Sequence, residues 1–227
     1  MDYWKDTTEC PVCKNTFMYS KVSTAAISVK SYDKDLKPNY NGPNPLKHSI
    51  ITCPNCFFTF NEKDVKDIHK FINDRNYSKI KDFLSKLDKD DFFEVNNYED
   101  KSNNFYKQQI VLASEIYSIL DLPFEVGRLL LKLSWQYRDD GDEGRELKIL
   151  NDVLKITLNY FEKALDNRDT IFSLFYTGYI YYRLGDKKNA AKYLDKLFRM
   201  FKDSKSPYIR AAKDLRGELE WKKFIFY

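Results

Sequence analysis

The sequence has 227 residues, of which 43% are hydrophobic and 32% charged, and its formal net charge is +4. This length is enough to bury a hydrophobic core, and the composition excludes a disordered chain. The longest apolar run, residues 171–182, is too short to span a bilayer, and the net charge is too mild to indicate nucleic-acid binding. The N-terminus has no secretory pattern, so we expect a cytoplasmic protein.

Four cysteines form two Cys-x2-Cys pairs, Cys10 with Cys13 and Cys53 with Cys56. Each pair lets two sulfurs reach one metal ion, and Zn²⁺ takes four thiolates in a tetrahedral arrangement. Two pairs complete that shell and leave no open position for water or substrate. The spacing therefore predicts one Zn²⁺ with a structural role.

Three alternatives compete with zinc. Two disulfides would need an oxidising compartment, which the N-terminus does not indicate. A thioredoxin-like redox pair would be a single Cys-x2-Cys near a βαβ pattern. An iron site uses the same four thiolates, and the spacing does not distinguish it from zinc. Lys14 and Phe57 stand where Gly often follows such a pair, so we expect slightly altered turns.

The 39 residues between the pairs must fold back to bring the cysteines together. Residues 21–32 are rich in β-branched side chains and predict a strand. Residues 35–47 carry three Pro and one Gly and predict a loop, and residues 48–53 predict a second short strand. Residues 1–60 are therefore expected to form a zinc-ribbon-like β module, much of whose stability comes from the metal.

Helical spacing begins at residue 61. Residues 61–74 and 76–87 predict two short helices, the first with Asn61 as its N-cap. Residues 88–104 are polar and acidic and are expected to be a linker, so 61–104 is the connecting region. Residues 105–227 form the expected helical domain, with amphipathic helices at 105–120, 123–139, 143–166, 169–184, 187–202 and 207–226.

Two glycines in this domain indicate a repeat. Tyr137-x3-Gly141-Asp142 recurs 44 residues later as Tyr181-x3-Gly185-Asp186. The second copy follows the tetratricopeptide pattern, in which stacked helix pairs form an array. Glu146 departs from that pattern in the first copy, and an ordinary bundle of antiparallel helix hairpins is the alternative. The expected class is α+β, mostly α.

The stretch between the cysteine pairs includes SVKSYDKDLKPNYNGPNPL (residues 28–46), and LSWQYRDDGD (residues 133–142) follows among the helices. With the two Cys-Pro-x-Cys pairs, these segments resemble the bacterial family called domain of unknown function 2225. The resemblance covers most of the chain. It implies a zinc-ribbon-like N-terminus joined to a helical repeat region, and it implies no reaction.

Catalysis is not expected. The chain has two histidines, His48 and His69, and neither stands in a pattern typical of a general base. Asp33 and Asp35 lie in a turn-rich segment where Asp commonly caps loops. The sequence also lacks a Walker loop and a nucleophile elbow. We assign no catalytic or cofactor-binding residue, and the metal ligands are the only site residues.

The leading functional hypothesis is a scaffold or adaptor that binds another protein through its helices. Residues 183–223 carry 13 Lys or Arg against 6 Asp or Glu, so an acidic partner segment is one candidate. In the last helix the spacing turns Ile209, Ala212, Leu215 and Leu219 inward and leaves Arg210, Lys213 and Arg216 to solvent. A larger bacterial assembly, including a membrane-bound flagellar or secretion machine, is a possible setting that no residue indicates directly.

The alternative hypothesis is a nucleic-acid-binding zinc ribbon. The expected β module contains lysines that could meet phosphates and aromatic residues that could stack on bases. The lysines are Lys5, Lys14, Lys21, Lys30, Lys34, Lys37 and Lys47, and the aromatic residues are Tyr3, Trp4, Phe17, Tyr19, Phe57, Phe58 and Phe60. Tyr176, Tyr179, Tyr181 and Tyr182 could instead line a protein-binding surface.

Overall fold

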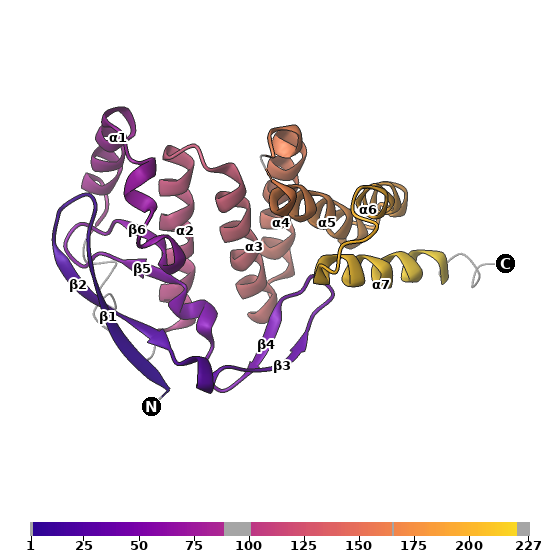
Figure 1. Cartoon of the computed structure of the whole chain (residues 1–227), viewed down its shortest axis with the longest axis horizontal. Coiled ribbons are helices and arrows are strands. Elements are labelled where there is room, and N and C mark those ends of the chain that lie inside the picture. The colour runs from indigo at the N-terminus through magenta and orange to yellow at the C-terminus, as the bar shows by residue number, and fades with distance from the viewer. Residues whose placement is uncertain (1, 89–100, 165, 222–227) are drawn as a thin grey trace. The chain divides into compact units, whose positions relative to one another are not determined.

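A computed structural model describes residues 2–88, 101–164 and 166–221 (Figure 1). The mostly helical α+β class is confirmed, with small two-stranded sheets near the N-terminus. The chain divides into two compact units. The first comprises Met1–Lys30 and Tyr40–Gln136, and the second comprises Ser31–Asn39 and Tyr137–Tyr227. This division differs from the expected 1–60, 61–104 and 105–227, which remain predictions about independently folding parts.

The first unit contains two antiparallel hairpins. Strand β1 (Tyr3–Glu9) pairs with β2 (Thr16–Val22), and β5 (Ile50–Thr52) pairs with β6 (Thr59–Asn61). Every residue of β5 and β6 is buried, whereas β2 alternates between buried and exposed positions over its first four residues. Each hairpin therefore has a core-facing side, and the turn that joins its strands carries one cysteine pair.

The segment between the hairpins contains more regular structure than its sequence predicts. A 3-10 turn at Thr24–Ala26 interrupts the strand expected at 21–32, because the Ala26 amide donates to the Ser23 carbonyl. Strand β3 (Ser28–Tyr32) follows. The expected loop contains β4 (Pro38–Asn41), which pairs with β3, and a 3-10 helix at Pro45–His48. Proline is tolerated here because it is the first residue of β4.

The helix expected at 61–74 is wrong. Asn61 belongs to β6, and two separate 3-10 turns follow it, at Glu62–Asp64 and Ile68–Phe71. The first α-helix, α1 (Asp74–Ser85), begins only where Asn73 forms a capping box with Asn76. In a capping box of this kind, side chains accept hydrogen bonds from the free backbone N–H groups at the helix start, whereas the side chain of Asn61 makes no such bond.

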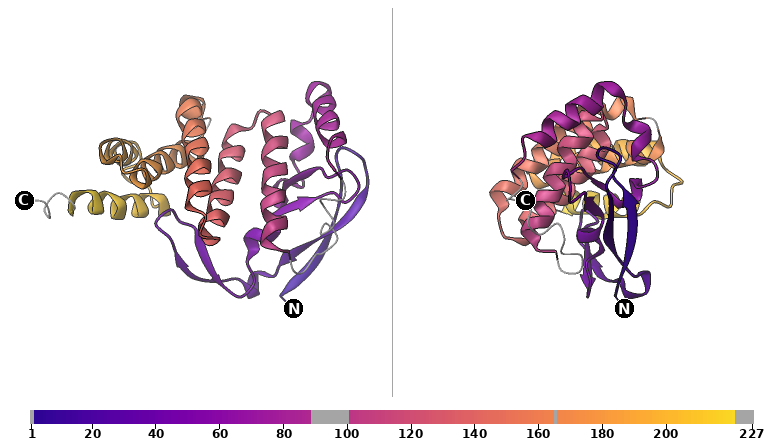
Figure 2. Two further views of the ribbon diagram at one scale, coloured as in Figure 1. Left: turned by 180° about the vertical axis from the view of Figure 1, so that it is seen from behind. Right: turned by 90° about the vertical axis from the view of Figure 1, so that its left-hand side faces the viewer.

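Two longer helices complete the first unit. Helix α2 (Asn103–Ile119) packs against β5, β6 and α1, and both figures show it beside the β5–β6 hairpin (Figures 1 and 2). Its fully buried Ile110 and Ile116 share this core with Phe58 and Phe60. Helix α3 (Pro123–Asp139) matches its expected range. Most of the expected linker at 88–104 lies outside the described residues.

The second unit contains α4 (Glu143–Tyr160), α5 (Asn167–Arg183), α6 (Lys187–Met200) and α7 (Pro207–Trp221). Helix α5 packs against the other three. Its Gly178 permits a close approach, because an added Cβ would lie 2.7 Å from Leu194 Cδ2 of α6. The inward stripe expected in α7 is buried, at Ile209, Ala212, Leu215 and Leu219.

The repeated Tyr-x3-Gly-Asp sequence is a turn that ends one helix and starts the next. Gly141 and Gly185 both have positive φ. The amides of Asp142 and Asp186 donate to the carbonyls of Tyr137 and Tyr181, and both aspartates cap the following helix. The repeat therefore has a local structural cause. The tetratricopeptide arrangement as a whole stays a prediction. No described helix is both long and apolar enough to cross a membrane.

Candidate metal centre

The two cysteine pairs sit on turns with the same backbone hydrogen bonds. In the first turn, the Cys10 amide donates to the Asn15 carbonyl at 2.9 Å and the Lys14 amide donates to the Cys10 carbonyl at 3.0 Å. In the second, the equivalent bonds from Cys53 and Phe57 are both 2.9 Å long. Both turns are closed by the hairpin strands that flank them, so each pair of sulfurs is presented by a fixed backbone.

The residue after each pair has a left-handed backbone. Lys14 and Phe57 both have φ of 63°, a region that side chains other than glycine rarely enter. The expected alteration of the turns is therefore absent, since both residues take the conformation that glycine would adopt. The two cysteine turns therefore share one backbone geometry.

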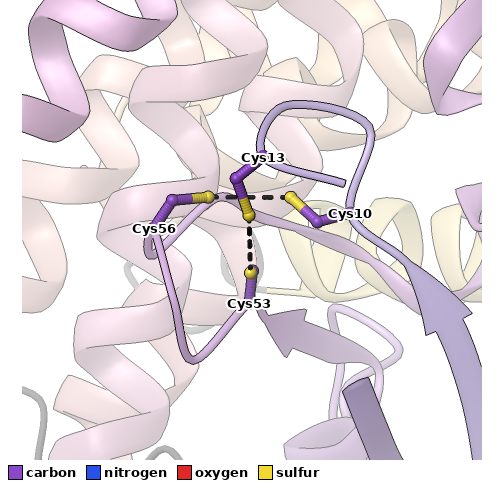
Figure 3. Close-up of side chains that lie close together, drawn as sticks. All are labelled: Cys10, Cys13, Cys53 and Cys56. Atoms are coloured by element: carbon purple, nitrogen blue, oxygen red, sulfur yellow. Dashed lines mark hydrogen bonds between the residues drawn. The ribbon is translucent and has the colours of Figure 1, made fainter. Parts of the chain in front are cut away.

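The four sulfurs converge on one point (Figure 3). Cys10 Sγ lies 3.6 Å from Cys56 Sγ, Cys13 Sγ lies 3.6 Å from Cys53 Sγ, and all four lie within 4.8 Å of one another. A tetrahedral ion with Zn–S bonds of about 2.3 Å needs sulfurs about 3.8 Å apart. The cluster therefore fits a tetrathiolate metal site, with Cys10 and Cys53 fully buried and Cys13 and Cys56 partly exposed.

Because the sulfurs lie close together, the pKa values of the Cys10, Cys53 and Cys56 thiols differ from one another. Hydrogen bonding with Cys53 raises the pKa of Cys10 to about 12, and hydrogen bonding with Cys10 raises the pKa of Cys56. The same contacts lower the pKa of Cys53 to about 2, because its thiolate accepts from its neighbours. Four thiolates this close together would repel one another. A divalent cation bound between them would stabilise all four in the deprotonated form.

Helix α1 braces the first turn from outside. The hydroxyl of Tyr77 donates to the carbonyl of Val12 at 3.1 Å. Phe57 and Phe58 of the second turn are buried. A shallow cavity of about 330 Å³ next to the cluster is lined by Cys13, Cys56 and Tyr77, among others. Cys10 and Cys53 are therefore packed in the core, whereas Cys13 and Cys56 line a cavity that is open to solvent.

The other polar residues singled out in the sequence are not members of the cysteine cluster. His48 is buried, its Nδ1 is 2.8 Å from Ser20 Oγ, and burial lowers its pKa to about 4. His69 is exposed. Neither histidine belongs to a group of possible metal ligands among the described residues. Asp33 and Asp35 do not serve only as loop caps, because both accept hydrogen bonds from Arg138 of the second unit.

Comparison with known proteins identifies a family. The model of a family described as uncharacterized proteins conserved in bacteria, domain of unknown function 2225, matches residues 3–219, so the chain belongs to that family. The suspected resemblance is confirmed. A search of curated proteins found no match, and a search of solved structures found none.

Relief of strain at Lys14 tests the geometry of the turn. Lys14→Gly should raise the free energy of unfolding of the metal-loaded protein by about 1 kcal/mol, because glycine has no Cβ penalty at positive φ. Lys14→Ala is the matched control, since it removes the same exposed pair with Glu9 and keeps the strain. Chemical denaturation measures both. Equal effects of the two substitutions would show that the backbone at Lys14 is unstrained.

Removal of one ligand tests how far the metal's influence extends. Cys53→Ser should lose the metal and expose residues 1–30 and 40–60 to limited proteolysis, because the two cysteine turns would no longer be joined through one ion. Most helical circular dichroism should remain, since α4–α7 have a separate core. Collapse of the whole helical signal in this variant, or on chelation of the native protein, would instead mean one cooperative unit.

Proposed function

This chain is a member of the domain of unknown function 2225 family, and we propose that it is a non-enzymatic scaffold or adaptor that carries one structural Zn²⁺. Four cysteines that could hold a metal ion are its most distinctive chemical group. A site with four thiolates has no open position for water or substrate, so its role is to fold the hairpins. The borderline-soft Zn²⁺ suits thiolate ligands and tetrahedral geometry.

One observation carries the scaffold proposal. The second unit contains an open cleft of about 640 Å³ between the 32–36 turn and α7. Its lining includes the large apolar or aromatic side chains of Tyr32, Leu36, Tyr208 and Leu215. The charged residues of its lining are Asp33, Lys34, Arg210, Asp214 and Glu218. A concave, partly apolar surface of this size suits a peptide segment of a partner protein. The tyrosines expected to line such a surface are divided, because Tyr176 and Tyr179 are buried and Tyr181 and Tyr182 are partly exposed.

The nucleic-acid alternative has less support. Lys21 is paired with Asp6 and Glu62, Lys14 with Glu9, and Lys34 with Glu218, so these cations are already compensated. Most of the aromatic side chains proposed for base stacking are instead part of the core; these are Phe17, Tyr19, Phe57, Phe58 and Phe60. Trp4 is half exposed, but Lys21 lies over its ring. Phosphate binding requires cations that are not already paired with carboxylates, and these three lysines of the module are paired in that way.

The partner and the setting are also part of the proposal. We place the protein in the cytoplasm, with a larger bacterial assembly such as a flagellar or secretion machine as one context. The basic side of α7 is the expected contact, and Arg210 and Lys213 are exposed there. Arg216 is less available, because its Nε donates to Asp195 Oδ1 at 2.9 Å.

Capture of the native partner tests this function. The double variant Arg210→Glu/Lys213→Glu should retain the fold and lower recovery of a specific partner protein roughly threefold or more, because exposed charge complementarity is reversed. Lys148→Glu/Lys192→Glu, at two other exposed lysines of this unit, is the matched control. Cross-linking and mass spectrometry after nuclease treatment measure recovery. Loss of all captured material on nuclease treatment would favour the nucleic-acid alternative.

A further inference from the structure

The 31–39 segment places two carboxylates against a buried arginine within the second unit. Arg138 donates from Nη2 to Asp35 Oδ2 at 2.8 Å, from Nη1 to Asp35 Oδ1 at 3.2 Å and from Nη1 to Asp33 Oδ2 at 3.3 Å. Its Nε donates to Glu146 at 2.7 Å and its Nη2 to the Tyr179 hydroxyl at 2.9 Å. All five guanidinium N–H groups are thereby used. Arg138 is a structural hub with no donor left for a ligand.

Arg183 shares this network and keeps donor capacity. Its Nη1 and Nη2 bind the two oxygens of Glu146 at 2.9 and 3.0 Å, and Nη1 also lies 3.3 Å from the Tyr179 hydroxyl. Within the described part of the chain, its Nε–H has no acceptor. The side chain is held by Glu146, which is 2% exposed, while remaining 23% exposed itself. Arg183 is therefore a positioned cation at the edge of a buried network.

A cleft of about 610 Å³ opens over these residues. The cations that line it are Lys34, Arg138, Arg183 and Lys187, whereas Asp33 is the one carboxylate in its lining. Lys34 is already paired with Glu218 at 2.6 Å, so Arg183 and Lys187 are the cations that can face a ligand. Asp35 and Glu146 balance the two arginines from behind, but they are buried and do not line the cleft. Lys187 is exposed and pairs with no carboxylate in the described ranges. The residues that line the cleft therefore carry more positive charge than the same residues taken together with the buried Asp35 and Glu146.

The cationic cleft adjoins the more apolar cleft beside α7. The two share Tyr32, Asp33 and Lys34, so the tip of the 31–39 segment forms a common wall. A free phosphate would contact only the cationic part. A chain with a carboxylate next to an aromatic or aliphatic residue would contact both, with the carboxylate near Arg183 and Lys187 and the apolar side chain near Leu36 and Tyr208.

We propose that these adjoining clefts bind a peptide segment in which acidic residues alternate with large apolar ones. Charge complementarity selects the carboxylates, because Arg183 and Lys187 face the cationic cleft and Asp33 is the one carboxylate that lines it. The apolar walls select the neighbouring side chains, because their contact removes hydrocarbon surface from water. This proposal deepens the scaffold function by naming the partner's chemistry, and it rests on that function.

Fluorescence anisotropy with two labelled peptides tests the site in the full-length, metal-loaded protein. One peptide alternates Glu with Phe, and the other has Gln at every Glu. The Glu peptide should bind at least about tenfold more tightly, and about 0.5 M salt should reduce that difference because the paired charges are exposed. Lys187→Glu should weaken its binding roughly fivefold.

Lys188→Glu is the matched control for Lys187→Glu, because it makes the same charge change at the next exposed position and does not line either cleft. It should change affinity less than about twofold. Equal binding of the two peptides, equal loss in the two lysine variants, or binding of inorganic phosphate without either peptide would overturn the proposal. Capture of the native partner that still depends on Arg210 and Lys213 would leave the scaffold function standing in each of these cases.

Discussion

The convergence of four sulfur atoms constrains the N-terminal hairpins more than any other contact in them. Cys10 and Cys56 are separated by 46 positions in sequence, yet their sulfurs are 3.6 Å apart. Bringing such distant positions together costs chain entropy, which a contact at the sulfurs must help to offset. A bound cation would supply stability by cancelling the charges of the thiolates. The left-handed backbones of Lys14 and Phe57 give the two cysteine turns the same shape.

The stretch between the cysteine pairs contributes to both units. Its ends belong to the hairpins of the first unit, and Ser31–Asn39 belongs to the second. Asp35 is fully buried there, where a single unpaired carboxylate would be costly, and the bidentate contact with Arg138 compensates it. Burial alone would lower the pKa of Arg138, but the hydrogen bonds and charge of Asp35 raise it above the usual value. The carboxylates of this segment therefore position a network whose outer edge is Arg183.

Local signals in the sequence were sufficient for the metal ligands and for most helices. The Cys-x2-Cys spacing depends only on residues within one turn, and Asp142, Asp186 and Gly185 act on helix ends within a few positions. These are short-range effects, so their outcome does not depend on the rest of the fold. The end of α4 at Tyr160, short of the expected residue 166, shows how weak such signals become where a 3-10 turn competes.

Interactions between distant residues could not be predicted in the same way. Helical spacing at Val65, Ile68 and Phe71 is real, but β6 and the capping box at Asn73 leave room only for 3-10 turns. Asp35 resembles a loop cap until its partner, 103 positions away, is known. The local sequence Asp35-Leu36-Lys37-Pro38 carries no sign of an arginine contact. Pairing of this kind needs either a structure or covarying positions among relatives.

X-ray absorption at the zinc edge of the purified protein tests the central claim most directly. The account predicts a first shell of four sulfur atoms at about 2.3 Å, with no nitrogen or oxygen ligand. The same shell should disappear in protein from which Cys10, Cys13, Cys53 or Cys56 has been removed. A shell that includes nitrogen or oxygen, an absorption edge belonging to iron, or oxidised cysteines without metal would contradict it.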